Sequence, residues 1–325
     1  MKNYSLTQKE INLQYKLLKM ISRSFSIPIN FLSRPIRFDV CNAYLIFRLA
    51  DIIEDLTDAK KNDRAILYRL LSETLSAPEK VFLFKNQLQA SLNQNVSSAT
   101  RKLIEHTDLV IRLYGFTSRH NKKIFDSHLN TMIDVMLQYD RDLGYDRITT
   151  ANDLDHYAWG VAGNVGEYLH DLFFLYHYQS ESTARSKRQA SQIGIGLQLV
   201  NIVMDINSDK KSGYSWLPSQ SLGIKGSDIK RLRSISKARI DKIAQQAVDN
   251  FSQGEDYLMA INFYSFRVKF FILFPVQLAK FILNKLLKTN EYSDARQIKP
   301  KRWQVYMMIA IVMLKSISVS RKSTI

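Results

Sequence analysis

Two acidic residues, Asp51 and Asp55, stand one helical turn apart at the end of a segment rich in Ala, Leu, Ile and Phe. A helix advances about 100° per residue, so both carboxylates share one stripe with Tyr44 and Arg48. The neighbouring residues predict a helix that is apolar nearly all round and therefore buried. Buried carboxylates must be paired or must hold a metal ion. The alternative is a solvated helix end at which Arg48 pairs with Asp51.

A second acidic pair, Asp205 and Asp209, repeats this pattern on another apolar segment, with Gln198 on the same stripe and Asn201 beside it. Carboxylates alone are hard oxygen ligands that suit Mg²⁺, an ion usually shared between protein and substrate phosphates. The six histidines are scattered, and the single cysteine, Cys41, cannot build a zinc cluster. Two such stripes facing a cavity would hold magnesium and, through it, a diphosphate.

Four sequence blocks over residues 15–280 resemble those of squalene/phytoene synthases in order and approximate spacing. The blocks are Ser22-Arg23-Ser24-Phe25; Arg37, Tyr44, Arg48 and Asp51 to Asp55; Tyr157 with Val161 to Gly166; and Gln198 to Asp209 with Trp216-Leu217-Pro218. One block is a weak signal, whereas four in order are a strong one. The resemblance implies an all-α, single-domain class I isoprenoid synthase fold around a central cavity. It also implies Mg²⁺-dependent, head-to-head joining of two prenyl diphosphates through a cyclopropylcarbinyl diphosphate.

The resemblance assigns roles to individual positions. The implied metal ligands are Asp51, Glu54 (through water or a hydrogen bond), Asp55, Asp205 and Asp209. The implied diphosphate-binding and supporting polar groups are Ser22, Arg23, Arg48, Gln198 and Asn201. The implied catalytic side chains are Tyr157, Tyr44 and Arg48. The two phenols would shuttle a proton or stabilise a carbocation.

The second acidic block departs from the family pattern at three positions. Met204, Ser208 and Tyr214 stand where the family usually has Arg, Glu and Arg. Lys210 and Lys211 are close enough in sequence to supply positive charge, although lysine is a point charge and not a bidentate fork. These departures leave open the alternative that the chain is a non-catalytic family member, which acts as a lipid-binding or assembly protein.

The product class is a finer question. The first acidic block, Ile52-Ile53-Glu54-Asp55, resembles the corresponding motif of squalene synthases. This resemblance predicts condensation of two farnesyl diphosphates to presqualene diphosphate or squalene. The alternative is condensation of geranylgeranyl diphosphate to phytoene. Squalene formation would also require NADPH. The missing GxGxxG motif decides nothing, because the family does not use a Rossmann fold for the reductant.

The elements that position these residues are predicted to be helices. Glycine and proline number 11 + 6 = 17 of 325 residues, which argues against β-sandwiches, barrels and disorder. Breaks are expected at Pro28, Pro35, Pro78, Gly144 and over 213–218. Apolar spacing predicts helices over 7–22, 37–57, 62–76, 80–92, 98–113, 119–140, 152–178, 184–209, 226–257, 262–288 and 302–317. The predicted domain covers residues 1–290, followed by a basic segment over 291–325.

Glycines recur every three residues at Gly160, Gly163 and Gly166, within a segment predicted to be helical. A phosphate-binding loop would need a GxxxxGK(S/T) pattern after a strand, and none is present. We therefore predict that these glycines, with Gly194 and Gly196, allow close packing of helices. His156 and His170 flank this region and are predicted to be polar core or rim residues.

The formal charge of 46 − 30 = +16 suits nucleic acid, anionic lipid or phosphorylated small molecules. Nucleic acid is disfavoured because no binding motif accompanies the charge. The N-terminus lacks a secretory pattern, and the apolar run Val305–Leu314 is too short to span a bilayer. We expect a cytoplasmic protein, monomer or homodimer, whose basic C-terminal segment contacts the membrane inner face near Trp303. The alternative is a terminal helix docked on the domain with a solvated basic tail.

Overall fold

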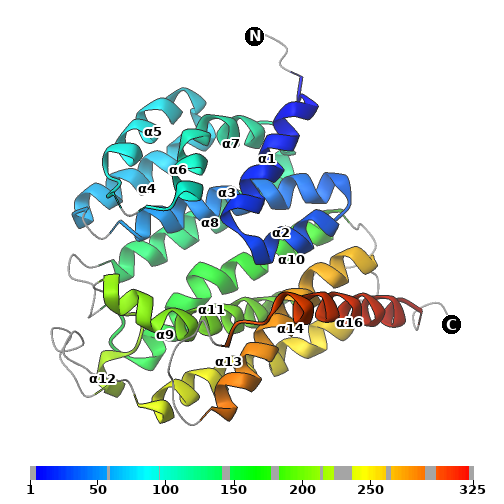
Figure 1. Ribbon diagram of the computed structural model, residues 1–325. Coiled ribbons are helices and arrows are strands. Elements are labelled where there is room, and N and C mark those ends of the chain that lie inside the picture. The colour runs from blue at the N-terminus through cyan, green and yellow to red at the C-terminus, as the bar shows by residue number, and fades with distance from the viewer. Residues whose placement is uncertain are drawn as a thin grey trace. The chain divides into compact units, whose positions relative to one another are not determined.

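All regular secondary structure in the described part of the chain is helical, which confirms the predicted all-α class (Figure 1). The computed structural model describes residues 5–56, 59–94, 96–140, 147–176, 183–212, 215–222, 236–260, 265–289 and 298–321. These residues belong to two compact units, Met1–Leu137 and Gln138–Ile325. The predicted domain boundary at residue 290 and the predicted central cavity stay predictions.

The first unit is organised around α3, a helix buried on most of its surface. Leu45, Ile46 and Leu49 are fully enclosed, as the apolar sequence predicts. The helix contacts α1, α2, α4, α6 and α7. The elements of this unit are α1 (Gln8–Ile21), α2 (Arg23–Phe31), α3 (Arg34–Glu54), α4 (Lys61–Ser76), η1 (Pro78–Lys80), α5 (Val81–Ala90), α6 (Ser98–Glu105), α7 (Thr107–Tyr114) and α8 (Arg119–Tyr139), whose last two residues fall in the second unit.

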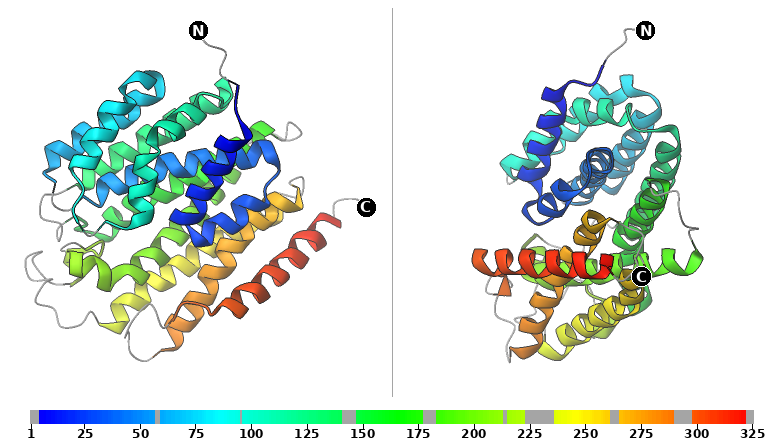
Figure 2. Two further views of the ribbon diagram at one scale, coloured as in Figure 1. Left: turned by 45° about the horizontal axis from the view of Figure 1, so that its top comes forward. Right: turned by 90° about the vertical axis from the view of Figure 1, so that its right-hand side faces the viewer.

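The second unit is organised around α11, which contacts α9, η3, α10, α13 and α14. Helices α14 and α16 lie side by side (Figure 1, Figure 2). The elements are α9 (Ala151–Ala158), the π-helical turn η3 (Trp159–Gly163), α10 (Asn164–Tyr176), α11 (Ala184–Ser212), α12 (Ser219–Leu222), α13 (Lys237–Ala260), α14 (Phe266–Lys288) and α16 (Arg302–Arg321). The π-turn widens the helix between α9 and α10, a distortion that is frequent at functional sites.

Close backbone approach joins this π-turn and α10 to α11. A Cβ atom added to Gly163 would lie 2.8 Å from Ser191 Oγ, and one added to Gly166 would lie 2.5 Å from the carbonyl oxygen of Ala190. A Cβ at Gly194 would overlap the carbonyl oxygen of Ala162. The prediction of close helix packing is confirmed at Gly163, Gly166 and Gly194.

Several helix boundaries differ from the predictions. The break expected at Pro28 is wrong, because α2 runs through this residue. The helix is short and capped by Ser22, so the proline removes one hydrogen bond without ending it. The single helix expected over 98–113 is also wrong: the backbone of His106 leaves the helical region and separates α6 from α7. Gly144, Gly213 and the start of the helix predicted over 226–257 lie outside the described residues.

Among the described helices, α14 alone is long and apolar enough to cross a membrane, with a mean hydropathy of 1.6. Half of that stretch is buried, and Phe270, Phe274 and Leu283 are almost fully enclosed in the second unit. A core helix of a soluble protein meets the same criteria, so this composition is weak evidence for a span. The sequence predicted this helix over 262–288 but singled out only Val305–Leu314 as an apolar run.

We expect Gly194→Ala to lower the free energy of unfolding by about 1–3 kcal/mol, because the new methyl group must push α11 away from the π-turn. Urea unfolding followed by far-UV circular dichroism measures this change. Arg188→Ala, an exposed position on the same helix, is the control and should change stability by less than about 0.5 kcal/mol. Equal stability of the two variants would contradict the packing role of Gly194.

Candidate active site

The first acidic pair lies at the end of α3 and shares one arginine. Arg48 Nη1 lies 3.3 Å from Asp51 Oδ2, and Arg48 Nη2 lies 3.7 Å from Asp55 Oδ2. The helix ends at Glu54, and Asp55 is its C-terminal cap. Two carboxylates and one guanidinium together carry one net negative charge. The cluster therefore retains the capacity to attract a cation.

Burial and charge act in opposite directions on this cluster. Burial raises the pKa of Asp51, although its side chain keeps 36% of its surface exposed, and Arg48 only partly offsets this rise. Burial acts to lower the pKa of Arg48, but the charges of Asp51 and Asp55 outweigh it and the pKa is raised. The arginine is thus held in its charged form by both carboxylates.

Tyr44 lies one turn before Arg48 on α3 and contacts the junction between α1 and α2. Its ring centroid lies 5.8 Å from that of Phe25. Burial raises the pKa of Tyr44, and a hydrogen bond with Ser22 acts to lower it. Ser22 Oγ also accepts a hydrogen bond from the Phe25 backbone at 3.1 Å, which caps α2. The side chain of Arg23 lies outside the described residues.

The second acidic pair lies near the C-terminal end of α11, and this helix carries all of the polar residues predicted there. Asp209 is buried, with 9% exposed, whereas Asp205 is exposed. Desolvation nevertheless raises the pKa of Asp205, while the charge of Lys299 and a hydrogen bond with Ser208 act to lower it. The two carboxylates therefore occupy unequal surroundings.

The other predicted residues of α11 have identifiable places. Asn201 Nδ2 donates to Gln198 Oε1 at 3.5 Å, on the polar side of the helix. Ser208 Oγ donates to the Asp205 carbonyl at 2.8 Å, so this hydroxyl serves its own helix. Lys210 is half-buried and Lys211 is exposed. Met204 is buried, and Tyr214 lies outside the described residues.

Within the described residues, no group of three or more His, Cys, Asp or Glu side chains is placed to hold a metal ion. Each unit contributes an acidic pair of its own. The structure brings together Ser22, Tyr44, Arg48, Asp51 and Asp55 in the first unit. It places Gln198, Asn201, Asp205, Asp209, Lys210 and Lys211 along one helix of the second unit.

Tyr157 belongs to an aromatic stack in the second unit. Its ring lies 4.0 Å from that of Trp216 between centroids, at an interplanar angle of 12°, and meets Tyr139 edge to face at 5.9 Å. The guanidinium of Arg147 covers Trp216 at 5.0 Å from the ring centroid. Tyr157 is only 2% exposed. Sequence spacing did not reveal that Trp216, which follows α11, is the residue that orients Tyr157.

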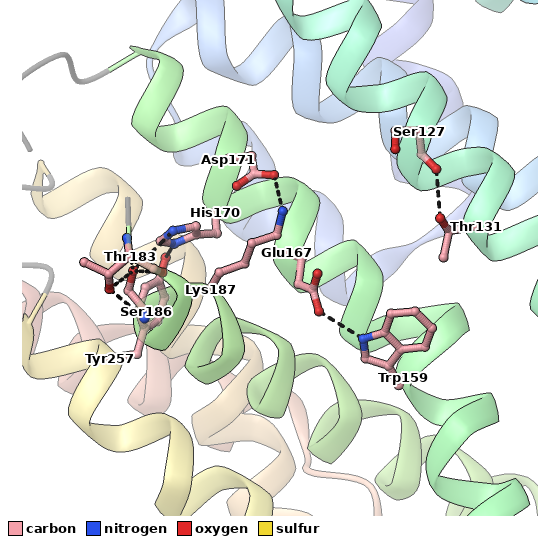
Figure 3. A network of polar contacts seen from close by, with 10 residues as sticks. All are labelled: Ser127, Thr131, Trp159, Glu167, His170, Asp171, Thr183, Ser186, Lys187 and Tyr257. Atoms are coloured by element: carbon pink, nitrogen blue, oxygen red, sulfur yellow. Dashed lines mark hydrogen bonds and ion pairs between the residues drawn. The ribbon is translucent and has the colours of Figure 1, made fainter. Parts of the chain in front are cut away.

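His156 extends this aromatic group on its other side. Its Nδ1 atom lies 3.0 Å from the Tyr139 hydroxyl, and its ring stacks on Trp159 at 5.6 Å. Trp159 Nε1 donates to Glu167 Oε1 at 2.9 Å (Figure 3). The histidine is therefore half-buried and hydrogen-bonded, as predicted for a polar rim residue.

His170 is fully buried, and its hydrogen bonds join α10 to α11 and α13 (Figure 3). Its Nδ1 atom lies 3.0 Å from the Tyr257 hydroxyl, and its Nε2 atom lies 3.4 Å from Ser186 Oγ. Beside it, Lys187 Nζ pairs with Asp171 Oδ2 at 2.6 Å. The prediction that His170 is a polar core residue is confirmed.

The family model for squalene/phytoene synthases matches residues 18–304. The chain belongs to this family. Its sequence is 27% identical to the squalene synthase of Candida albicans over 218 residues, which cover 66% of this chain and 47% of that protein. It is 30% identical to a bifunctional lycopene cyclase/phytoene synthase of Gibberella fujikuroi over 208 residues, which cover 62% and 34%. The chain thus spans about half the length, or less, of these relatives.

Solved structures show the same fold. The complex of TcSQS with the ligand E5700 superimposes with a TM-score of 0.73, covering 97% of this chain and 90% of that one at 19% identity. The squalene synthase HpnC from Alicyclobacillus acidocaldarius gives a TM-score of 0.57, covering 90% and 96% at 16% identity. The predicted isoprenoid synthase helical fold is confirmed.

The buried His170 predicts a pH dependence of stability. Burial lowers the pKa of His170 from 6.5 to about 4, so the unfolded chain binds a proton between these values that the folded chain does not. Its stabilising contribution is complete above pH 6.5 and falls by roughly 2–3 kcal/mol as the pH drops to about 4. The free energy of unfolding, measured by urea titration across this range, should fall less steeply in His170→Asn. His120→Asn, at an exposed position, is the control and should keep the slope of the unsubstituted chain.

Proposed function

We propose that this chain is a Mg²⁺-dependent prenyltransferase that joins two farnesyl diphosphates head to head, giving presqualene diphosphate or squalene. The observation that carries this proposal is the cluster of Arg48, Asp51 and Asp55 at the end of α3. It lies in a chain that belongs to the squalene/phytoene synthase family. The first acidic block is complete, and Glu54 before Asp55 favours the squalene type over the phytoene type.

The carboxylates fit a divalent cation. Asp51 and Asp55 share a single guanidinium, so their combined charge is not neutralised. We assign Asp51, Asp55, Asp205 and Asp209 as magnesium ligands, with Glu54 acting through water or a hydrogen bond. Magnesium would stabilise the negative charge that develops on the departing diphosphate.

Cationic and hydroxyl groups of the chain would bind the same diphosphate. Arg48 offers planar N–H donors, and the positions of Ser22 at the N-cap and Arg23 in the first turn of α2 suit the same task. Lys210 and Lys211 supply positive charge near the second pair, where Met204 and Ser208 replace the family's usual charged residues. Gln198 and Asn201 are assigned as supporting polar groups on α11.

The two phenols are assigned to the carbocation and its proton. The raised pKa of Tyr44 keeps its hydroxyl neutral and able to donate a hydrogen bond. Trp216 covers one face of the Tyr157 ring, so the substrate would meet the remaining face or the hydroxyl. An aromatic face stabilises positive charge where water is excluded.

Two other functions are supported by specific observations. Similarity to the Gibberella fujikuroi enzyme supports a phytoene-type condensation of geranylgeranyl diphosphate. Buried Met204 and the locally bonded Ser208 support a non-catalytic, lipid-binding or assembly role.

We place the protein in the cytoplasm at the membrane inner face, where farnesyl-type substrates and apolar products reside.

Incubation of the purified chain with radiolabelled farnesyl or geranylgeranyl diphosphate and Mg²⁺, with and without NADPH, separates these functions. We expect a C30 product from farnesyl diphosphate, and squalene only with NADPH. A C40 product from geranylgeranyl diphosphate alone would indicate the phytoene type. No diphosphate release under any condition would defeat both enzyme proposals.

We expect Asp51→Asn and Asp205→Asn each to lower diphosphate release at least about 100-fold, because each removes a charge that holds the metal. Initial rates measure the loss, and circular dichroism should show unchanged helix content. Asp134→Asn, an exposed position on α8, is the control and should keep full activity. Full activity in either site variant would refute the metal assignment.

A further inference from the structure

A buried arginine, Arg147, contacts the same tryptophan ring as the proposed catalytic Tyr157. Its guanidinium carbon lies 5.0 Å from the centroid of the Trp216 ring. The Tyr157 ring lies 4.0 Å from the Trp216 ring and is inclined to it by 12°. Residues 147–157 begin with the arginine and end with the tyrosine, so both ends of this segment meet at one indole.

All three side chains are enclosed in the second unit. Arg147 is 4% exposed, Trp216 is 9% exposed and Tyr157 is 2% exposed. An arginine keeps its charge when it is buried, so the charge must meet polar or π-electron groups. Tryptophan is the aromatic residue that attracts a cation most strongly, and the attraction grows where water is excluded. The contact with Arg147 therefore restrains the indole in a way that an exposed contact would not.

Backbone hydrogen bonds join the segment that follows Arg147 to the start of α12, just after the indole. The Ser219 amide donates to the Ile148 carbonyl at 3.0 Å. The Gln220 amide donates to the Thr149 carbonyl at 3.1 Å. These bonds hold the two segments beside each other, and the guanidinium then fixes the orientation of the indole within this frame.

The ring of Tyr157 is held in place by its own helix and by two neighbouring rings. Thr150 caps α9 and forms a capping box with Asp153, which fixes the start of the helix that carries Tyr157. Tyr139 meets the ring edge to face, at 84°. The near-parallel contact with Trp216 restrains the ring plane. A phenolic O–H bond lies in the plane of its ring, so this plane sets the directions in which the hydroxyl can donate.

We propose that Arg147 is a positioning residue for the condensation reaction. By holding Trp216, it fixes the ring plane of Tyr157 and the direction of the hydroxyl that acts on the carbocation or its proton. This inference rests on the proposed function, because it uses the role assigned there to Tyr157. Direct binding of a diphosphate by Arg147 is disfavoured, because an enclosed guanidinium packed on an indole offers little surface to an anion.

Steady-state kinetics with farnesyl diphosphate and Mg²⁺ test the role of the cation. Arg147→Met removes the charge and keeps an unbranched side chain, whereas Arg147→Lys keeps a cation that can lie over the ring. We expect Arg147→Met to lower kcat for diphosphate release at least about tenfold and to change KM by less than about threefold. Arg147→Lys should keep kcat within about threefold of the unsubstituted chain. A raised KM with unchanged kcat in Arg147→Met would overturn the positioning role.

A matched control and a double-mutant cycle separate positioning from general stability. Arg267 lies 5.8 Å from the ring centroid of Phe266 at the exposed start of α14, so Arg267→Met removes a cation–π contact of the same unit and should keep both kinetic constants. In a Trp216→Leu background, Arg147→Met should cause no further loss of kcat, because the residue acts through the indole. Additive losses, or an equal loss in the control, would refute the proposal. Thermal unfolding checks the fold of every variant.

Near-UV circular dichroism tests the positioning without catalysis. Fixed aromatic packing produces this signal, and the difference between the chain and Trp216→Leu gives the contribution of the stacked pair. Arg147→Met should lose most of this contribution, whereas Arg147→Lys and Arg267→Met should keep it. An unchanged spectrum in Arg147→Met would overturn the inference even in an active synthase. A changed spectrum in a chain that releases no diphosphate would support the hold on Tyr157 and defeat only the proposed function.

Discussion

A helix with a broad apolar surface must be enclosed by other helices, and each unit of this protein depends on one such helix. In the first unit α3 contacts five neighbours, and in the second α11 does the same. Enclosure leaves polar residues few places other than the helix ends. The acidic pairs lie there: Asp51 and Asp55 at the end of α3, and Asp205 and Asp209 in the last turns of α11.

The same enclosure explains the glycines and the π-turn. Gly163, Gly166 and Gly194 let α11 approach its neighbour at backbone distance, where any side chain would overlap a main-chain or hydroxyl atom. This neighbour also carries Tyr157, in the last turn of α9 before the π-turn. Packing and the orientation of the proposed catalytic phenol therefore share one local constraint, and Trp216 completes it by stacking on the ring.

The helices and the polar stripes were predictable from sequence because both follow from the periodicity of side chains. The enclosed α3, the acidic residues on α11 and the packing glycines all have this origin. The break predicted at Pro28 is wrong, since a capped short helix tolerates this proline. Spacing along one helix indicated the Arg48–Asp51 pair but not the added contact with Asp55. The stack of Trp216 on Tyr157 depends on tertiary packing, which local spacing does not encode.

In the proposed site, Arg48 would couple the binding of two charged partners, a divalent ion and a diphosphate. The guanidinium pairs with one oxygen of each carboxylate, so a carboxylate that turned this oxygen toward a divalent ion would release a donor of Arg48. The released donor would then be available to a diphosphate that accompanied the ion. Each ligand would thus raise the affinity for the other by the same factor. An arginine that serves as counter-ion in the empty protein would become an anion receptor in the loaded one.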